Sequence, residues 1–243
     1  MSSRFYLADI KPDSDAQLID HQAHHALNVM RLKSGDQVTL FDGAGHEFNA
    51  TIIGTTRKTV DLEVGAQLEV DREASRRLTI AAAIPKGDRS RWLVEKLTEI
   101  GVARFVPLVC QRSSVKISPS SMAKFEKYVV EASKQCGRNR LMEIAPAMEF
   151  QEMLEQGLGA ESPIKLIGST VEPSQTAAQL AGSGLFSNRS SVLVLIGPEG
   201  GFTEGEMTAA RSADFQAFSL ASSILRIETA ALAAAAVFVN LPA

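Results

Sequence analysis

Ile196-Gly-Pro-Glu-Gly-Gly201 follows an apolar run, beginning at Val192, that is typical of a buried strand. A glycine-rich turn lets the backbone approach a ligand where a Cβ atom would clash. Ligands of open α/β sheets gather at the carboxyl ends of the strands. The stretch therefore predicts an α/β fold with a pocket at this strand end, although glycine and proline also make plain tight turns.

A second segment, Ile224-Leu-Arg-Ile-Glu-Thr-Ala230, follows a predicted strand over 215–220 and begins a long alanine-rich helix. Two strand ends with special turns predict one small-molecule pocket. The chain contains neither G-x-x-x-x-G-K-[ST] nor G-x-G-x-x-G, so neither standard phosphate-binding loop is supported.

The pattern of the chain changes near residue 70. The first part predicts a small β-rich, barrel-like module with strands over 5–10, 37–41, 47–53 and 59–64 and one helix over 21–31. Residues 71–77 are polar and charged, which predicts a linker. The second part predicts strands over 78–84, 105–109, 164–167 and 192–196, helices over 90–100, 120–136 and 203–213, and a loop over 182–191. Strands separated by helices predict a mostly parallel sheet covered on both faces.

Composition indicates an ordinary soluble protein. The chain has 243 residues, of which 45% are apolar and 22% charged. Its longest apolar stretch, 230–239, is about half the length that a membrane span needs. The N-terminus lacks the cationic start of a signal peptide, and two cysteines suggest no disulfide framework. We therefore expect a cytoplasmic protein without membrane contact.

Although the net charge of the chain is −3, its central segment is strongly cationic. Residues 73–140 contain 14 Lys and Arg against 6 Asp and Glu, whereas the flanking parts are both acidic. Local fields attract polyanions even when the net charge does not, which favours RNA as a partner over a set of solvated helix faces. The cations with few acidic neighbours in the sequence are Lys86, Arg89, Arg91, Arg112, Lys116, Lys134, Arg138 and Arg140.

Six short motifs, in order, resemble one family. They are Arg4-Phe-Tyr6, His24-His25 with Met30-Arg31, Lys86-Gly-Asp88 with Glu95 to Gly101, Gln135-Cys-Gly-Arg138, the GPEGG stretch, and L-x-x-x-I-L-R-x-E-T-A from Leu220. Over its whole length the chain resembles the RsmE family of 16S ribosomal RNA uridine-N3 methyltransferases, in the SPOUT superfamily. It departs from the family pattern at Ala221, Ser223 and Lys134, where glycine, arginine and glutamate are common.

The resemblance implies a fold, a cofactor and partners. The fold would be a PUA-like RNA-binding domain over 1–70, a linker over 71–77, and a SPOUT methyltransferase domain over 78–243 with a C-terminal trefoil knot. The methyl donor would be S-adenosyl-L-methionine (SAM), no metal would take part, and the protein would be a homodimer. The substrate would be ribosomal RNA of the small subunit, with uridine 1498 as the family target.

The same resemblance implies roles for individual residues. The expected cofactor-binding residues are Ile196, Gly197, Glu199, Gly200, Gly201, Leu220, Ser222 and Leu225. The expected catalytic residues are Arg138, acting from the partner subunit, Arg226 and Glu228. The expected RNA-binding residues are Arg4, Arg31, Lys86, Arg89, Arg112, Lys116, Gln135 and Arg138.

Some alternatives stay open at this point. Glu228 either accepts the uridine proton or caps the last helix, where acids are favoured. Cys136 is a candidate nucleophile, but N3 attack needs no covalent adduct and a buried thiol is the better interpretation. His24 and His25 do not share a helix face, which argues against a metal pair. Trp92 is expected in the core or an interface rather than stacked on a base. A 2′-O-ribose methyltransferase and a non-catalytic RNA-binding assembly factor are the competing functions.

Overall fold

The computed structural model describes residues 3–155, 164–170, 175–187 and 191–241. Contacts within the chain divide it into two units. The first comprises the residues up to Glu73 together with Ser133–Leu141, and the second comprises Ala74–Ala132 and the residues from Met142 onward. The domain boundaries expected from the sequence stay a prediction, and the structure adds that 133–141 pack with the first unit.

The first unit is built on a curled sheet with the strand order β1-β3-β4-β5-β2. The strands are β1 (Arg4–Tyr6), β2 (Ser14–Leu18), β3 (Gln37–Phe41), β4 (Glu47–Thr55) and β5 (Val60–Leu68). β1 pairs with β3 in parallel, and the other pairs are antiparallel. Alternate side chains such as Phe5, Leu40 and Leu62 are buried in one core, as expected for a sheet with one apolar face.

The first unit differs from expectation in three places. The strand expected over 5–10 ends at Tyr6, and the edge strand β2 was missed because its sequence, SDAQL, is mostly polar. The expected helix begins as α1 (Asp20–His24) and continues as a π-helical turn over His25–Val29.

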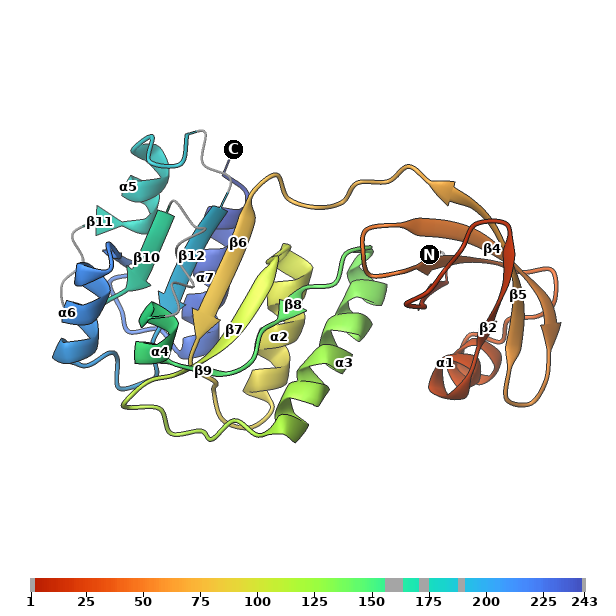
Figure 1. Cartoon of the computed structure of the whole chain (residues 1–243), viewed down its shortest axis with the longest axis horizontal. Helices are drawn as coiled ribbons and strands as arrows, with labels where there is room; N and C mark the ends of the chain where they lie inside the picture. The colour runs from red at the N-terminus through yellow and green to blue at the C-terminus, as the bar shows by residue number, and fades with distance from the viewer. Residues whose placement is uncertain (1–2, 156–163, 171–174, 188–190, 242–243) are drawn as a thin grey trace. The chain divides into compact units, whose positions relative to one another are not determined.

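The second unit contains the parallel sheet that the strand–helix alternation predicts (Figure 1). The strand order is β11-β13-β10-β12-β6-β7-β8, and β9 also pairs with β7. These strands are β6 (Arg77–Ala82), β7 (Arg104–Val109), β8 (Glu143–Ile144), β9 (Met148–Glu149), β10 (Ile164–Gly168), β11 (Gln175–Thr176), β12 (Ser191–Ile196) and β13 (Gln216–Ser219). All their pairs are parallel, so the carboxyl ends of β10, β12 and β13 meet at one edge.

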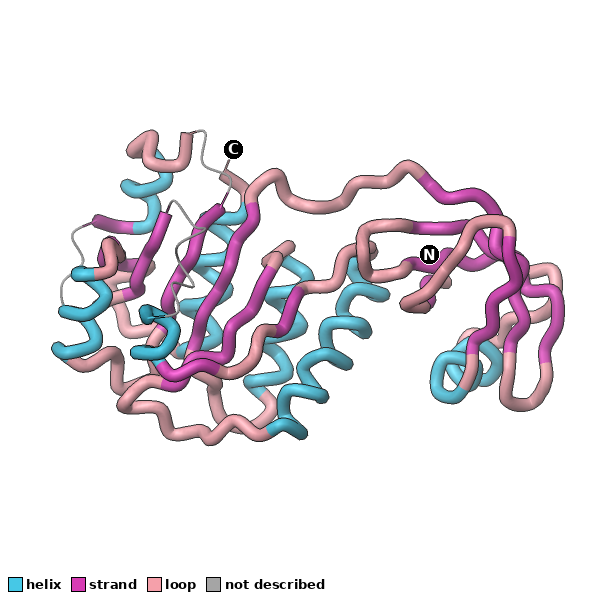
Figure 2. Tube along the Cα trace, viewed as in Figure 1, coloured by secondary structure: helices cyan, strands magenta, loops and turns pink. Residues whose placement is uncertain are grey.

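Helices cover both faces of this sheet (Figure 2). They are α2 (Arg89–Ile100), α3 (Pro119–Cys136), α4 (Phe150–Glu155), α5 (Ala177–Gly182), α6 (Glu204–Ser212) and α7 (Ile227–Val239). α7 packs on α2 and against β6 and β12. Its small side chains, including Ala231, Ala234 and Ala235, are fully buried, which lets the helix approach the strands closely. Phe150 and Met153 of α4 and Ala210 of α6 pack in a core cluster with residues of β10 and β12.

Turn and capping residues in the sequence predicted the ends of the long helices correctly. Helix α2 ends at Gly101, which has φ 103° in the left-handed region, and α6 begins with the expected capping box of Thr203 and Glu206. The short elements β8, β9, β11, α4 and α5 were missed, because tertiary contacts rather than sequence pattern stabilise elements of this length. Of the predicted loop over 182–191, Gly182 ends α5, residues 183–187 form turns and Ser191 begins β12, while residues 188–190 lie outside the described residues. Within the described part of the chain, no helix is long and apolar enough to cross a membrane.

Candidate cofactor-binding site

A cavity of about 510 Å³ lies where three parallel strands of the second unit end. Gly168 ends β10, Ile196 ends β12 and Ser219 ends β13, and all three line the cavity. This is the strand-end position at which open α/β sheets bind ligands. The volume falls within the range of roughly 300–1,000 Å³ that small-molecule sites occupy.

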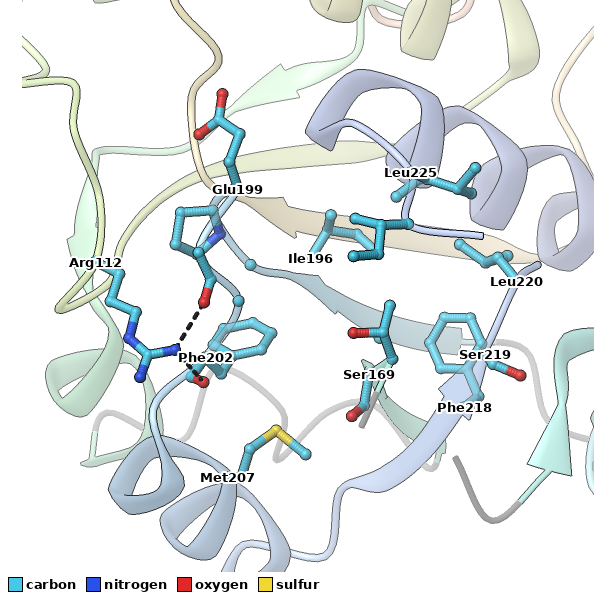
Figure 3. Close-up of a pocket in the computed structure, with 18 of the residues that line it drawn as sticks. Arg112, Ser169, Ile196, Glu199, Phe202, Met207, Phe218, Ser219, Leu220 and Leu225 are labelled. Carbon is cyan, nitrogen blue, oxygen red and sulfur yellow. Dashed lines mark hydrogen bonds between the residues drawn. The ribbon is translucent and has the colours of Figure 1, made fainter. Parts of the chain in front are cut away.

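The wall combines apolar side chains with hydroxyl and charged groups (Figure 3). The apolar part comprises Ile196, Phe202, Met207, Phe218, Leu220, Ile224 and Leu225. Hydroxyl groups come from Ser169, Thr170, Ser219 and Ser223, and charges from Arg112, Glu199, Glu204 and Arg211. A mostly apolar pocket with a few placed polar groups is typical of a cofactor site.

The GPEGG loop forms one side of the cavity as a tight turn. Gly201 N donates to the Pro198 carbonyl at 2.8 Å, and Gly201 adopts φ +68°, which L side chains rarely adopt. A Cβ atom on Gly197 would lie 3.0 Å from the ring of Phe202. The backbone conformation therefore favours glycine at position 201, and the close approach of the Phe202 ring favours it at position 197.

The second signature segment forms the opposite side. Leu225, just before α7, and Ala230, in its first turn, line the cavity. Arg226 is the exposed N-cap residue of that helix. The Glu228 side chain is only 7% exposed and lies 3.4 Å from Arg89, whose other terminal nitrogen is 3.9 Å from Glu199. Glu228 Oε2 has no hydrogen-bond partner among the described residues.

The predicted cofactor residues gather at this cavity with one exception. Ile196, Gly197, Glu199, Gly200, Gly201, Leu220 and Leu225 all line it. Among the residues that the structure describes, Ser222 is not part of the lining, although its neighbours Ala221 and Ser223 are. Neither Arg226 nor Glu228 is part of the described lining.

Sequence reasoning missed the third strand end. Gly168, Ser169 and Thr170 follow the predicted strand over 164–167, so the rule applied to β12 would have found them. Met207, Arg211 and Phe218 carry no sequence signal of their own, because their side chains reach the cavity only through the packing of α6 and β13. Phe202 directly follows the GPEGG loop.

The predicted RNA-binding residues fall into two groups. Arg31, Lys86, Arg112, Lys116 and Gln135 are exposed, and Arg89 is partly buried. Arg4 and Arg138 are instead held inside the first unit. Arg4 lies 3.0 Å from Glu47 and over the Phe41 ring. Arg138 is 5% exposed and donates to both carboxylate oxygens of Glu73, at 3.0 and 2.6 Å.

Cys136 differs from expectation, and Trp92 lies outside the core, while its expected place in an interface stays a prediction. Cys136 is exposed, so its interpretation as a buried thiol is wrong, because it lies at the end of α3 rather than on its packed face. Cys110 is the buried thiol, and its burial and the nearby Glu206 raise its pKa to about 12. Trp92 is 44% exposed and is not a core residue. Within the described residues, no cluster of three or more His, Cys, Asp or Glu side chains could hold a metal ion.

Two family descriptions match the chain. An RNA methyltransferase domain matches residues 72–239, and an RNA methyltransferase PUA domain matches residues 18–65. Fold and cavity together thus define an RNA methyltransferase with an N-terminal PUA domain. The predicted fold class, with a curled PUA-like sheet and a parallel-sheet SPOUT domain, is confirmed. The trefoil knot stays a prediction.

Relatives of known family cover nearly the whole chain. The ribosomal RNA small subunit methyltransferase E of Rickettsia conorii is 32% identical, over 89% of this chain and 86% of its own. The Bacillus subtilis protein of the same name is 30% identical, over 87% of this chain and 84% of its own. The chain belongs to the ribosomal RNA small subunit methyltransferase E (RsmE) family, which confirms the resemblance seen in its motifs.

Two solved structures are similar throughout. Ribosomal RNA small subunit methyltransferase E from Neisseria gonorrhoeae, bound to SAM, has a TM-score of 0.87 at 30% identity and covers 97% of this chain and 96% of its own. A putative methyltransferase from Legionella pneumophila, in complex with SAM, also has a TM-score of 0.87 at 30% identity, with 98% and 96% covered.

Proposed function

We propose that this protein transfers a methyl group from SAM to N3 of a uridine in 16S ribosomal RNA, and that the nucleotide is the family target, uridine 1498. The observation that carries the proposal is the cavity formed by the GPEGG loop and the L-x-x-x-I-L-R-x-E-T-A segment at three strand ends. It occurs in a chain that belongs to the RsmE family and resembles SAM-bound structures over almost its full length.

The cavity fits SAM in size, polarity and charge. Its apolar side chains suit the adenine ring, and the hydroxyl groups and glycine backbone suit the ribose. Glu199 and Glu204 complement the positive sulfonium and ammonium groups, and Arg211 complements the carboxylate. The open space beside Gly201, where no described atom lies within 4 Å of a Cβ position, leaves room for the ligand against the loop.

SAM supplies an activated methyl group for in-line displacement, so the protein must hold the uracil in line and remove the N3 proton. Glu228 is the proposed proton acceptor. Its carboxylate is buried at the first turn of α7, three residues after the lining residue Leu225 in the chain, and Oε2 has no described partner. A carboxylate without a full set of hydrogen bonds is available to accept a proton.

Arg226 is the proposed electrostatic partner of the uridine anion. It is exposed and is the N-cap residue of α7. A cation and a helix N-terminus both favour developing negative charge. These two groups would lower the free energy of the deprotonated uridine relative to the neutral base.

Recognition of RNA rests on the exposed residues of the cationic segment. Lys86, Lys116 and Gln135 present donors to solvent, and Arg31 does so from the first unit. Arg138 was expected to act across a homodimer. Its guanidinium pairs with Glu73, so a catalytic role requires this ion pair to break. Mixed dimers test whether Arg138 serves the active site of the partner subunit. Inactive Arg138→Ala and Gly201→Val subunits should regain activity when mixed if the arginine serves the partner's site.

The test of the function is direct. Small subunits and free 16S RNA from a strain lacking the protein are incubated with the enzyme and methyl-labelled SAM, and the product is mapped by mass spectrometry. The proposal expects one N3-methyluridine, with a reaction that lacks the enzyme as the negative control and less product from the Gly201→Val enzyme at limiting SAM. If the labelled methyl group were instead found on a ribose 2′ oxygen, the protein would be a 2′-O-ribose methyltransferase. RNA binding without label on either substrate would indicate a non-catalytic assembly factor.

A further inference from the structure

Arg112 contacts the GPEGG loop rather than extending freely into solvent (Figure 3). Its Nη1 donates to the Gly200 carbonyl at 2.7 Å and lies 3.5 Å from the Phe202 carbonyl. Arg112 also lines the cavity itself. The sequence assigned this residue to RNA phosphates, but its described contacts are with the loop that forms the cavity wall.

The carbonyl that accepts this hydrogen bond lies at the conformationally special point of the loop. Gly200 and Gly201 share a peptide unit, and Gly201 has φ +68°. A charged donor on the Gly200 oxygen therefore fixes the orientation of the whole Gly200–Gly201 peptide, including the Gly201 N–H. The aliphatic part of Arg112 also packs on the loop, because a Cβ atom on Gly200 would lie 3.2 Å from Arg112 Cδ.

The segment that carries Arg112 is itself anchored. Gln111 N donates to Glu206 Oε1 at 2.8 Å, while Glu206 Oε2 accepts from Thr203 N in the capping box of α6. On the other side, Cys110 N donates to Ser113 Oγ at 2.9 Å. Arg112 thus extends from a fixed turn, so its guanidinium can hold the loop in place instead of following it.

We propose that Arg112 is a positioning residue for the methyl donor. It holds the GPEGG loop in the conformation that binds SAM, with Glu206 as the anchor of its own segment. A loop that is ordered before the ligand arrives costs less to order during binding, so this contact raises SAM affinity. The inference rests on the proposed location of SAM in this cavity.

The experiment compares SAM affinity with RNA affinity in four variants. Arg112→Ala should weaken SAM binding, measured by calorimetry, on the order of 10-fold, as expected for one charged hydrogen bond at an exposed site. Arg112→Lys should recover part of the loss, because an ammonium still donates to a carbonyl. Glu206→Gln should weaken SAM binding less, because one of its two acceptor oxygens is retained. Lys124→Gln removes an exposed cation of α3 and should leave SAM affinity unchanged.

Two further measurements separate positioning from a phosphate contact or a general loss of structure. For Arg112→Ala the KM for SAM should rise while kcat at saturating SAM stays within about two-fold. The slope of RNA affinity against salt should also stay unchanged. The proposal would be overturned if SAM affinity stayed unchanged while the slope of log RNA affinity against log salt concentration fell by about one. Arg112 would then be a phosphate contact.

The Gly201→Val variant distinguishes this inference from the proposed function. If Gly201→Val loses SAM binding and Arg112→Ala keeps it, only the positioning role is refuted. If Gly201→Val also keeps SAM binding, SAM does not bind in this cavity, and both the location and the positioning role fail. If Arg112→Ala does not fold, judged by its thermal unfolding, the comparison rests on Arg112→Lys and Glu206→Gln, and full SAM affinity in both refutes the role.

Discussion

Replacing Gly201 with valine is the sharpest test of whether SAM binds in this cavity, because the main expected effect of the substitution is a change in backbone conformation. Gly201 has φ +68°, and no described atom lies within 4 Å of the position that a Cβ would take. The substitution therefore meets a conformational cost, and its Cβ atom clashes with no described residue beyond its chain neighbours. An L residue in the left-handed region costs about 1–2 kcal/mol, and a β-branched residue lies at the upper end of that range.

The expected consequence is a loss of SAM affinity. To relieve the strain, φ at residue 201 must become negative, which turns the Gly200–Gly201 peptide and alters the cavity wall. If about 1–2 kcal/mol is then required to restore the binding conformation, SAM affinity falls roughly 5–30-fold. Any direct clash of the valine side chain with the ligand adds to this loss, so the calculated factor is a lower bound.

A matched control is available in the same unit. Gly184 has φ +75°, again with no described atom within 4 Å of its Cβ position, and it does not contribute to the described cavity lining. Gly184→Val should lower the unfolding temperature by an amount similar to Gly201→Val, roughly 2–8 °C for a unit of this size, with unchanged SAM affinity. Calorimetry and thermal unfolding measure both quantities. A Gly201→Val protein that binds SAM within two-fold of the wild type refutes the reasoning, as does an equal loss in Gly184→Val.

Three further outcomes follow from single residues. Arg226→Ala should lower kcat on the order of 100-fold with SAM affinity unchanged, and higher pH should recover part of the rate because more uridine is already deprotonated; a loss of SAM affinity instead would make Arg226 a cofactor residue. Burial raises the pKa of Cys110 to about 12, so iodoacetamide at pH 8 should label the exposed Cys136 and leave Cys110 unmodified, and equal labelling by mass spectrometry would contradict this. Burial raises the pKa of Glu47, but hydrogen bonds from two arginines outweigh it and lower the pKa below 4.5. The stability from Glu47 is therefore complete above about pH 4.5 and lost as the pH falls through the folded pKa, and urea unfolding from pH 3 to 6 should show a weaker pH dependence for Glu47→Gln.

The strand-end rule predicted more of the site than any single motif did. The GPEGG loop and the segment from Leu220 were expected at one pocket, and both line the cavity. The same rule applied to the strand over 164–167 would have added Ser169 and Thr170. The rule does not predict the side chains that α6 contributes to the cavity, such as Met207. Helical periodicity shows which face of a helix is apolar, but not which strands that face covers.

The cations show the limit of reading charge from a sequence. Arg112 and Arg138 were assigned to RNA partly because their sequence neighbours left them unbalanced, and Arg4 because of the resemblance of its motif to the family. In the fold, Arg4 forms an ion pair with Glu47, and Arg138 forms one with Glu73. The Arg112 guanidinium donates a hydrogen bond to a backbone carbonyl. Each partner is distant in sequence, so no local window contains it.

The sequence by itself determined the class of fold, the long helices and strands, the caps of α2 and α6, and the family. These depend on hydrophobic periodicity, turn-forming residues and short motifs, which act over a few neighbouring residues. Only the tertiary structure decided which cations are committed to ion pairs, which cysteine is buried, and that the third strand end and α6 complete the cavity. Those outcomes depend on which distant segments pack together, because hydrogen bonds, ion pairs and burial act over a few ångströms in space, whatever the separation along the chain.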